Sequence, residues 1–209
     1  MKLPREQRLL LSGPAGNLDT VVNDPGDARR GLALIAHPHP LYGGTLDNKV
    51  VQTLAKAFFA QGCVSVRMNF RGVGASDGVF DEGRGETQDW LHVAQAMRSR
   101  FGELPLTLAG FSFGAFVQSR VAAQLSAERL VLVAPAVGRF TVERVPVGTL
   151  VIHGEEDDVV PLKDVLDWAR PQTLPVVVLP GAGHFFHGNL IELARIVQNT
   201  CPCLPPESC

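Results

Sequence analysis

The pentapeptide Gly-Phe-Ser-Phe-Gly at 110–114 has the residue types and spacing of a turn that exposes a nucleophilic serine. It follows the apolar run Leu106–Ala109 and precedes a segment of helical character, residues 116–125. A serine at the apex of such a turn has a strained backbone, and glycine on either side avoids a clash because it has no Cβ. We therefore expect the Ser112 hydroxyl at the end of a strand, and the Phe113 N–H at a helix N-terminus that favours an anion. The motif alone is ambiguous, since it can arise by chance among 21 glycines.

A weakly acidic serine hydroxyl needs a neighbouring base, and imidazole has a suitable pKa near neutrality. We predict that His184 is this base. It follows the apolar run Val176–Leu179, and glycines at 181 and 183 let its loop bend back over the sheet edge. His187 is the second candidate, but it lies nearer the next helical segment and is interpreted as structural.

The base in turn needs a carboxylate that fixes its tautomer. Four carboxylates, Glu155 to Asp158, follow the apolar run Thr149–Ile152. Most members of such a charge run are solvated, and spacing alone does not separate Asp157 from Asp158. The chain order is nevertheless serine, acid, histidine, each after a successive strand, which is the order found in α/β-hydrolases.

Strands and helices that would position these residues alternate along the chain. Arg8–Ser12 and Thr20–Val22 are predicted to form an antiparallel pair near the edge. Six buried strands are predicted at Leu32–Ala36, Val64–Arg67, Leu106–Ala109, Leu130–Val133, Thr149–Ile152 and Val176–Leu179. Helices are predicted at residues 47–60, 86–101, 112–125, 162–169 and 190–199, several with apolar side chains at helical spacing. The pattern predicts an eight-stranded, mostly parallel sheet covered on both faces, with ligands at the carboxyl ends of its strands.

The whole chain resembles the α/β-hydrolases, and within them a group of small bacterial serine hydrolases without a lid. The resemblance is most specific in His37–Val50 (HPHPLYGGTLDNKV) and Asn69–Gly78 (NFRGVGASDG). His153–Pro161 (HGEEDDVVP) resembles the family segment H-G-x-x-D-x-x-V-P, whose aspartate is the acid of the catalytic triad; this implies Asp157. The resemblance implies the α/β-hydrolase fold and esterase-like activity.

The second half of an anion hole should come from the loop after the strand at 32–36. Pro38 and Pro40 are excluded because proline has no N–H. In the family the donor lies two residues beyond the histidine that ends this strand, which implies His39 beside Phe113. A metal bound by His37 and His39 is not expected, because strand alternation would point the two rings apart and no further ligand pattern accompanies them.

Many relatives carry a helical cap before the strand that bears the acid. Here only residues 134–148 are available, so we expect no cap domain and an open, shallow site. The predicted substrate-binding residues around Phe113 are Leu41, Tyr42, Phe80, Val137 and Phe185. Arg71 is a possible anchor for a substrate carboxylate, although pairing with an acid such as Asp77 or Glu86 is the preferred interpretation.

Composition limits the remaining possibilities. The 209 residues are 45% hydrophobic, which fits one domain over residues 1–200 followed by a tail rich in proline and cysteine at 201–209. A net charge of −2 without basic runs argues against nucleic acid as a partner. We expect a cytoplasmic protein with no leader, no membrane span and four free thiols. The sequence does not determine the oligomeric state, and the expectation is a monomer or weak dimer.

The favoured function is hydrolysis of small or short-chain esters through an acyl-enzyme on Ser112, without a cofactor. Thioester, lactone or amide hydrolysis by the same residues is an alternative, because the tetrahedral chemistry is shared. A non-catalytic scaffold that binds a partner is a further alternative, since a fold does not determine a function.

Overall fold

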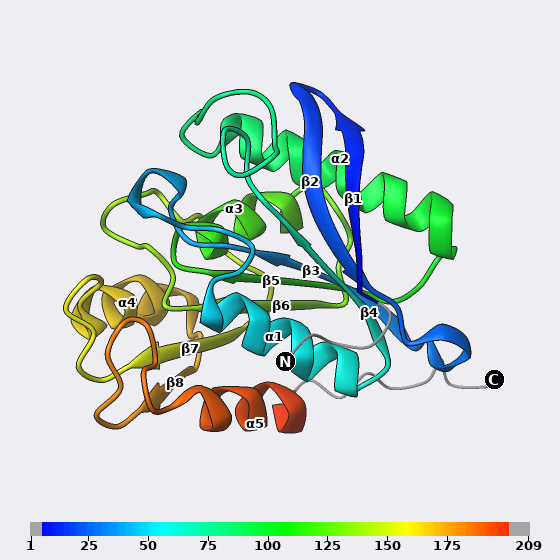
Figure 1. Cartoon of the computed structure of the whole chain (residues 1–209). Helices are drawn as coiled ribbons and strands as arrows, with labels where there is room; N and C mark the ends of the chain where they lie inside the picture. The colour runs from blue at the N-terminus through cyan, green and yellow to red at the C-terminus, as the bar shows by residue number, and fades with distance from the viewer. Residues whose placement is uncertain (1–5, 201–209) are drawn as a thin grey trace.

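A computed structural model describes residues 6–200, whose strands all belong to one eight-stranded sheet (Figure 1). The strand order is β1-β2-β4-β3-β5-β6-β7-β8. The strands are β1 (Glu6–Gly13), β2 (Gly16–Asn23), β3 (Gly31–Ala36), β4 (Cys63–Met68), β5 (Leu106–Phe111), β6 (Arg129–Val133), β7 (Leu150–Gly154) and β8 (Val176–Leu179). β1 and β2 pair antiparallel, β2 pairs antiparallel with β4, and the other six strands are parallel. The predicted sheet is confirmed.

Successive side chains of each central strand point to opposite faces of the sheet, and those on both faces are apolar. Helices therefore cover both faces. The helices are α1 (Lys49–Ala60), α2 (Arg84–Phe101), α3 (Phe113–Ala122), α4 (Leu162–Ala169) and α5 (Leu190–Thr200). In β3, Leu34 packs with α2 and α3, whereas its neighbour Ile35 packs with α1 and α5. Figure 1 shows α1 and α5 side by side on one face and α2 and α3 on the other.

The helix boundaries follow local capping. The helix predicted at 47–60 begins at Lys49 because the Oδ1 atom of Asn48 accepts a hydrogen bond of 2.9 Å from the Val50 N–H. The helix predicted from 112 to 125 begins after Ser112 and already ends at Ala122. Three short 3-10 turns complete the described elements: η1 (Gly26–Ala28), η2 (Pro40–Tyr42) and η3 (Arg170–Gln172).

The strand order reverses between β3 and β5. From β3 the chain crosses to β4 on one side, and it then returns to β5 on the other side. The loops that follow two such strands separate and leave a crevice at their carboxyl ends. The loops after β3, β5, β7 and β8 lie at this end of the sheet, on the left of Figure 1.

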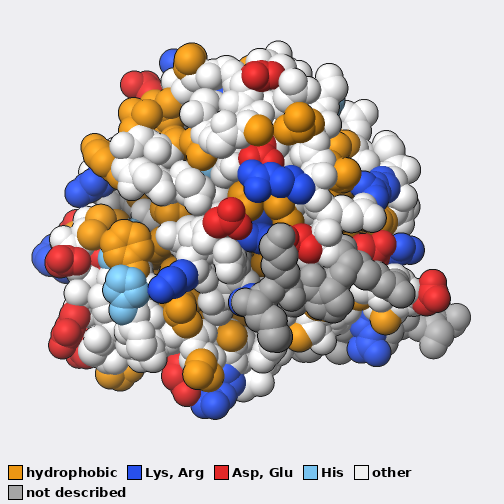
Figure 2. Space-filling model, viewed as in Figure 1, with side chains coloured by type: hydrophobic (Ala, Val, Ile, Leu, Met, Phe, Trp, Pro, Cys, Tyr) orange, Lys and Arg blue, Asp and Glu red, His pale blue; other side chains and the backbone are white. Residues whose placement is uncertain are grey.

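The expectation of four free thiols is wrong at Cys63, which is disulfide-bonded. The other three cysteines and the predicted tail at 201–209 lie outside the described residues. Within residues 6–200, no helix is long and apolar enough to cross a membrane. On the face seen in Figure 2, acidic and basic side chains are interspersed rather than gathered by sign, as the near-neutral composition would suggest.

Candidate active site

Ser112 lies at the turn between β5 and α3, where its backbone has φ 55° and ψ −115°. A positive φ is strained for a residue with a Cβ. The two flanking glycines are required by close backbone approach. A Cβ on Gly110 would lie 2.2 Å from the Gly114 carbonyl oxygen, and one on Gly114 would lie 2.4 Å from that of Ala36. The turn therefore packs closely against the end of β3 through Gly114.

His184 joins the serine to an acid across three loops. Its Nε2 atom lies 3.2 Å from the Ser112 Oγ atom, and its Nδ1 atom lies 2.7 Å from the Asp157 Oδ2 atom. Ser112 follows β5, Asp157 follows β7 and His184 follows β8. All three residues are at most 8% exposed. The arrangement can pass a proton from the hydroxyl to the imidazole while the carboxylate stabilises the imidazolium.

Asp157, rather than Asp158, faces the imidazole. Its Oδ1 atom accepts hydrogen bonds from the backbone N–H groups of Val159 and Val160, at 2.9 and 2.7 Å. Burial raises the pKa of Asp157, but the hydrogen bonds from His184 and Val160 outweigh this effect and lower the pKa overall. Asp158 is exposed. The structure thus separates two acids that spacing did not.

Two other histidines lie close to this group. His187 is exposed and stacks on Phe185 with ring centroids 5.9 Å apart. Sequence reasoning did not select His153, whose Nε2 atom lies 2.9 Å from the Val160 carbonyl oxygen and 3.5 Å from the Asp157 Oδ2 atom. Its position at the start of the HGEEDDVVP segment was the available signal. Burial lowers the pKa of His153, so the ring is neutral and donates to Val160.

The backbone N–H groups of His39 and Phe113 follow β3 and β5, the two strands at which the sheet order reverses. No residue in the range 6–200 accepts a hydrogen bond from either group. Gly44 is needed nearby, because a Cβ there would lie 2.1 Å from the Pro38 carbonyl oxygen. Two unpaired donors beside a nucleophile can bind an oxyanion.

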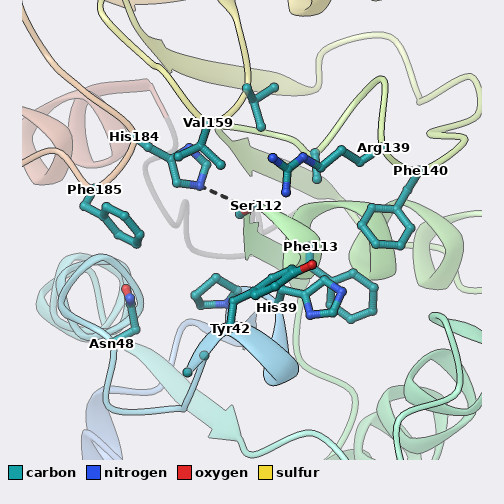
Figure 3. A pocket seen from close by; sticks show the side chains of 15 residues that line it. His39, Tyr42, Asn48, Ser112, Phe113, Arg139, Phe140, Val159, His184 and Phe185 are labelled. Carbon is teal, nitrogen blue, oxygen red and sulfur yellow. Dashed lines mark hydrogen bonds between the residues drawn. The ribbon is translucent and has the colours of Figure 1, made fainter.

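A cavity of about 250 Å³ lies beside Ser112 (Figure 3). Of the five predicted substrate-binding residues, Tyr42 and Phe185 line this cavity, and Phe113 lines it as well. The other three do not. Leu41 is 67% exposed, Val137 is buried in the core, and the Phe80 ring packs 5.6 Å from the Phe113 ring. Lining residues that sequence reasoning missed include Asn48, Arg139, Phe140 and Val159.

Arg71 is not part of this cavity. Its Nε and Nη2 atoms each donate a hydrogen bond of 2.8 Å to the fully buried carboxylate of Asp89. The prediction that Arg71 pairs with an acid is right, but the partner is neither Asp77 nor Glu86. Glu86 instead accepts hydrogen bonds from backbone N–H groups at the start of α2. Among residues 6–200, no group of three or more histidine, cysteine, aspartate or glutamate side chains is arranged to hold a metal ion.

Comparisons with known proteins show similarity to hydrolases. A family model described as serine aminopeptidase, S33, matches residues 41–141. A solved structure of an α/β serine hydrolase homologue from Coxiella burnetii is 38% identical, with 96% of this chain and 99% of that chain covered and a TM-score of 0.88. XC6422 from Xanthomonas campestris, an α/β serine hydrolase without a lid, is 37% identical over 100% of both chains, with a TM-score of 0.92.

A sequence relative, the uncharacterized protein RP471 of Rickettsia prowazekii, is 28% identical over 92% of this chain and 87% of its own length. The similar structure of XC6422 has no lid, and the connection from β6 to β7 in this chain is likewise short. Residues 134–149 of that connection contain no helix.

Proposed function

The chain belongs to the α/β-hydrolase superfamily, and on this premise we propose that it is a serine carboxylesterase for small or short-chain esters. The observation that carries the proposal is the hydrogen-bonded line from Ser112 through His184 to Asp157. Ser112 lies in a small cavity beside the backbone N–H groups of His39 and Phe113, which have no acceptor among the described residues.

The proposed reaction has two steps. His184 takes the Ser112 proton as the Oγ atom attacks the ester carbonyl, and the oxyanion is bound by the N–H groups of His39 and Phe113. The alcohol leaves with a proton from His184, and water then hydrolyses the acyl-enzyme by the same route. Asp157 orients the imidazole throughout.

The size of the cavity supports small substrates. Its volume of about 250 Å³ is below the ~300–1,000 Å³ of pockets that enclose larger ligands. Tyr42 is 78% exposed and Phe185 is 45% exposed, so the mouth is open to solvent. We expect short acyl chains to be preferred over long ones in a series of p-nitrophenyl esters, with no interfacial activation.

The test combines labelling with turnover. Wild-type protein should react with a fluorophosphonate probe and hydrolyse p-nitrophenyl acetate, and Ser112→Ala should lose the label and roughly 10⁴–10⁶-fold in kcat. Ser119→Ala is the matched control, because Ser119 lies on the same helix with its hydroxyl bonded to the Phe116 carbonyl. An unlabelled wild type would favour the non-catalytic scaffold, and retained turnover in Ser112→Ala would refute the assignment of the nucleophile.

A further inference from the structure

The cavity beside Ser112 contains one permanent charge. Among the described residues that line it, only Arg139 is always charged, and none is aspartate or glutamate. Figure 3 shows the guanidinium end of Arg139 pointing into the cavity on the side of Ser112. A cation facing an otherwise mostly apolar site creates a specific demand for an anionic group.

Arg139 has no partner of its own within the described chain. Neither an ion pair nor a hydrogen bond joins its side chain to any residue between 6 and 200, although Arg8 and Arg71 each bind a fully buried aspartate. Asp164 lies near the same loop, since its Oδ2 atom is 3.5 Å from where a Cβ on Gly138 would be, but it does not pair with Arg139. The guanidinium is therefore available to a ligand.

The loop that carries Arg139 is fixed on both sides of it. Val137 and Val142 are 5% and 7% exposed, and the Phe140 ring stacks on Phe116 with centroids 4.9 Å apart. The Trp168 indole N–H also donates a hydrogen bond of 2.8 Å to the Val142 carbonyl. The anchored loop fixes the backbone of Arg139, so only its exposed side chain has to be ordered when a ligand binds, which limits the entropic cost of binding.

The charge of Arg139 is felt by another group of the cavity. Burial lowers the pKa of His39, and repulsion by Arg139 lowers it further. His39 is the residue whose N–H we propose as an oxyanion donor. The field of Arg139 thus reaches the imidazole ring of His39, which also lines the cavity.

We propose that the natural substrate carries a carboxylate, which Arg139 binds while the ester carbonyl lies at Ser112. The inference rests on the proposed esterase function. The planar fork of a guanidinium matches a carboxylate with two parallel hydrogen bonds. A cavity of about 250 Å³ has room for only a short acyl group. The substrate class is therefore half-esters of short dicarboxylic acids.

The test compares two esters of nearly equal shape. Monoethyl succinate carries a carboxylate, and ethyl succinamate replaces it by a neutral amide. The ratio of their kcat/KM values, measured by ethanol release, should favour the half-ester in the wild type. Arg139→Gln should lower this ratio by roughly 10- to 100-fold, the usual effect of losing a hydrogen-bonded charge pair. Arg144→Gln removes the same charge from the same connection outside the cavity, and it should leave the ratio unchanged.

Calorimetry of the two esters with Ser112→Ala measures the ratio of their dissociation constants, which reports the carboxylate preference without turnover. If Ser112→Ala binds the half-ester more tightly and the added Arg139→Gln abolishes this preference, the inference is supported. This result does not depend on turnover, so the inference and the proposed esterase activity can fail separately. Equal ratios in the wild type and Arg139→Gln would overturn the inference while leaving a neutral esterase intact. An equal fall in Arg144→Gln would also overturn it, because net charge alone would then explain the preference.

Discussion

The Nε2 atom of His37 accepts a hydrogen bond of 2.9 Å from the backbone N–H of Phe70, which joins the loop after β3 to the loop after β4. The Nδ1–H group of the same ring donates to the Pro38 carbonyl at 2.7 Å. Burial lowers the pKa of His37 to about 3, so the ring is neutral and keeps this pattern at physiological pH. His37 therefore fixes the segment that presents the His39 N–H.

Replacing His37 by phenylalanine should impair both stability and turnover. An aromatic ring is retained, but the Phe70 N–H loses its acceptor, which should cost about 2 kcal/mol in the free energy of unfolding. Displacement of the His39 N–H should lower kcat roughly 10- to 100-fold, less than outright removal of an oxyanion donor. Urea unfolding and ester kinetics measure the two effects. His92→Phe, on α2, is the control, and an unchanged kcat in His37→Phe would limit His37 to a structural role.

Asp157→Asn should lower kcat about 10⁴-fold, because an amide favours the wrong imidazole tautomer. Asp158→Asn is a closely matched control, since it makes the same change one residue away on an exposed side chain. Steady-state hydrolysis of a p-nitrophenyl ester by the two variants distinguishes the positions. Comparable losses in both would contradict the role of Asp157 as the acid.

The sequence was most informative where one local rule decides the structure. Apolar strands separated by helices predicted the sheet, and the two glycines of the turn predicted the position of Ser112. Choosing Asp157 required the family resemblance. Asp158 is the same residue type one position later, and the two differ only in the direction of their side chains. Thus the strand ends could be predicted from periodicity, whereas the direction of a side chain in a loop could not.

Interactions between irregular segments were not predictable. Arg139 lies on a connection without periodicity, so nothing indicated that it faces the cavity. Arg71 pairs with Asp89 because Glu86, one turn earlier on α2, is already used by backbone N–H groups at the helix start. Competition of this kind depends on the complete three-dimensional arrangement.

Gly114→Ala should prevent the turn from closing. The new Cβ would lie 2.4 Å from the Ala36 carbonyl oxygen and 2.5 Å from that of His37, and backbone atoms of a central strand cannot withdraw cheaply. We expect a loss of at least about 3 kcal/mol in unfolding free energy, in the range of severe core defects. Gly102→Ala is the comparison, because its Cβ would meet open space. Its backbone has φ 81° and ψ −174°, a region almost restricted to glycine, so about 1–3 kcal/mol of backbone strain applies without any steric clash. Thermal unfolding that ranks Gly102→Ala as the worse variant would contradict this explanation.

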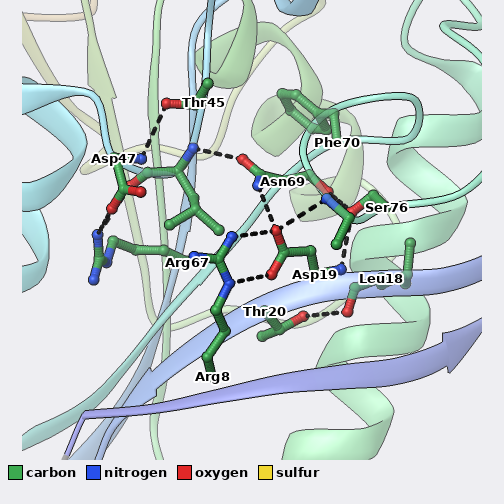
Figure 4. A network of polar contacts seen from close by, with 12 residues as sticks. Arg8, Leu18, Asp19, Thr20, Thr45, Asp47, Arg67, Asn69, Phe70 and Ser76 are labelled. Atoms are coloured by element: carbon green, nitrogen blue, oxygen red, sulfur yellow. Dashed lines mark hydrogen bonds and ion pairs between the residues drawn. The ribbon is translucent and has the colours of Figure 1, made fainter.

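Asp19 connects the first hairpin to the loops beside the site (Figure 4). Its buried carboxylate accepts hydrogen bonds of 2.7 and 2.6 Å from Arg8 and one of 2.7 Å from the Asn69 Nδ2 atom. The Asn69 Oδ1 atom in turn accepts from the Leu46 N–H at 2.8 Å. Hydrogen bonding by Arg8 lowers the pKa of Asp19 despite the opposing effect of burial.

Asp19→Asn should cost about 2–3 kcal/mol in unfolding free energy at pH 7, because Arg8 and the buried Asn69 lose their charged acceptor. The folded pKa lies below the unfolded value of about 3.9, so the carboxylate stabilises the protein above that pH, and the stabilisation is lost as pH falls through the folded pKa. The difference between wild type and variant in urea unfolding should therefore shrink below about pH 4. Asp167→Asn, which breaks exposed pairs with Lys163 and Arg170, should have a much smaller effect, because solvent screens exposed ion pairs. A difference for Asp19→Asn that persists undiminished at pH 2 would show that side-chain packing, rather than charge, accounts for its effect.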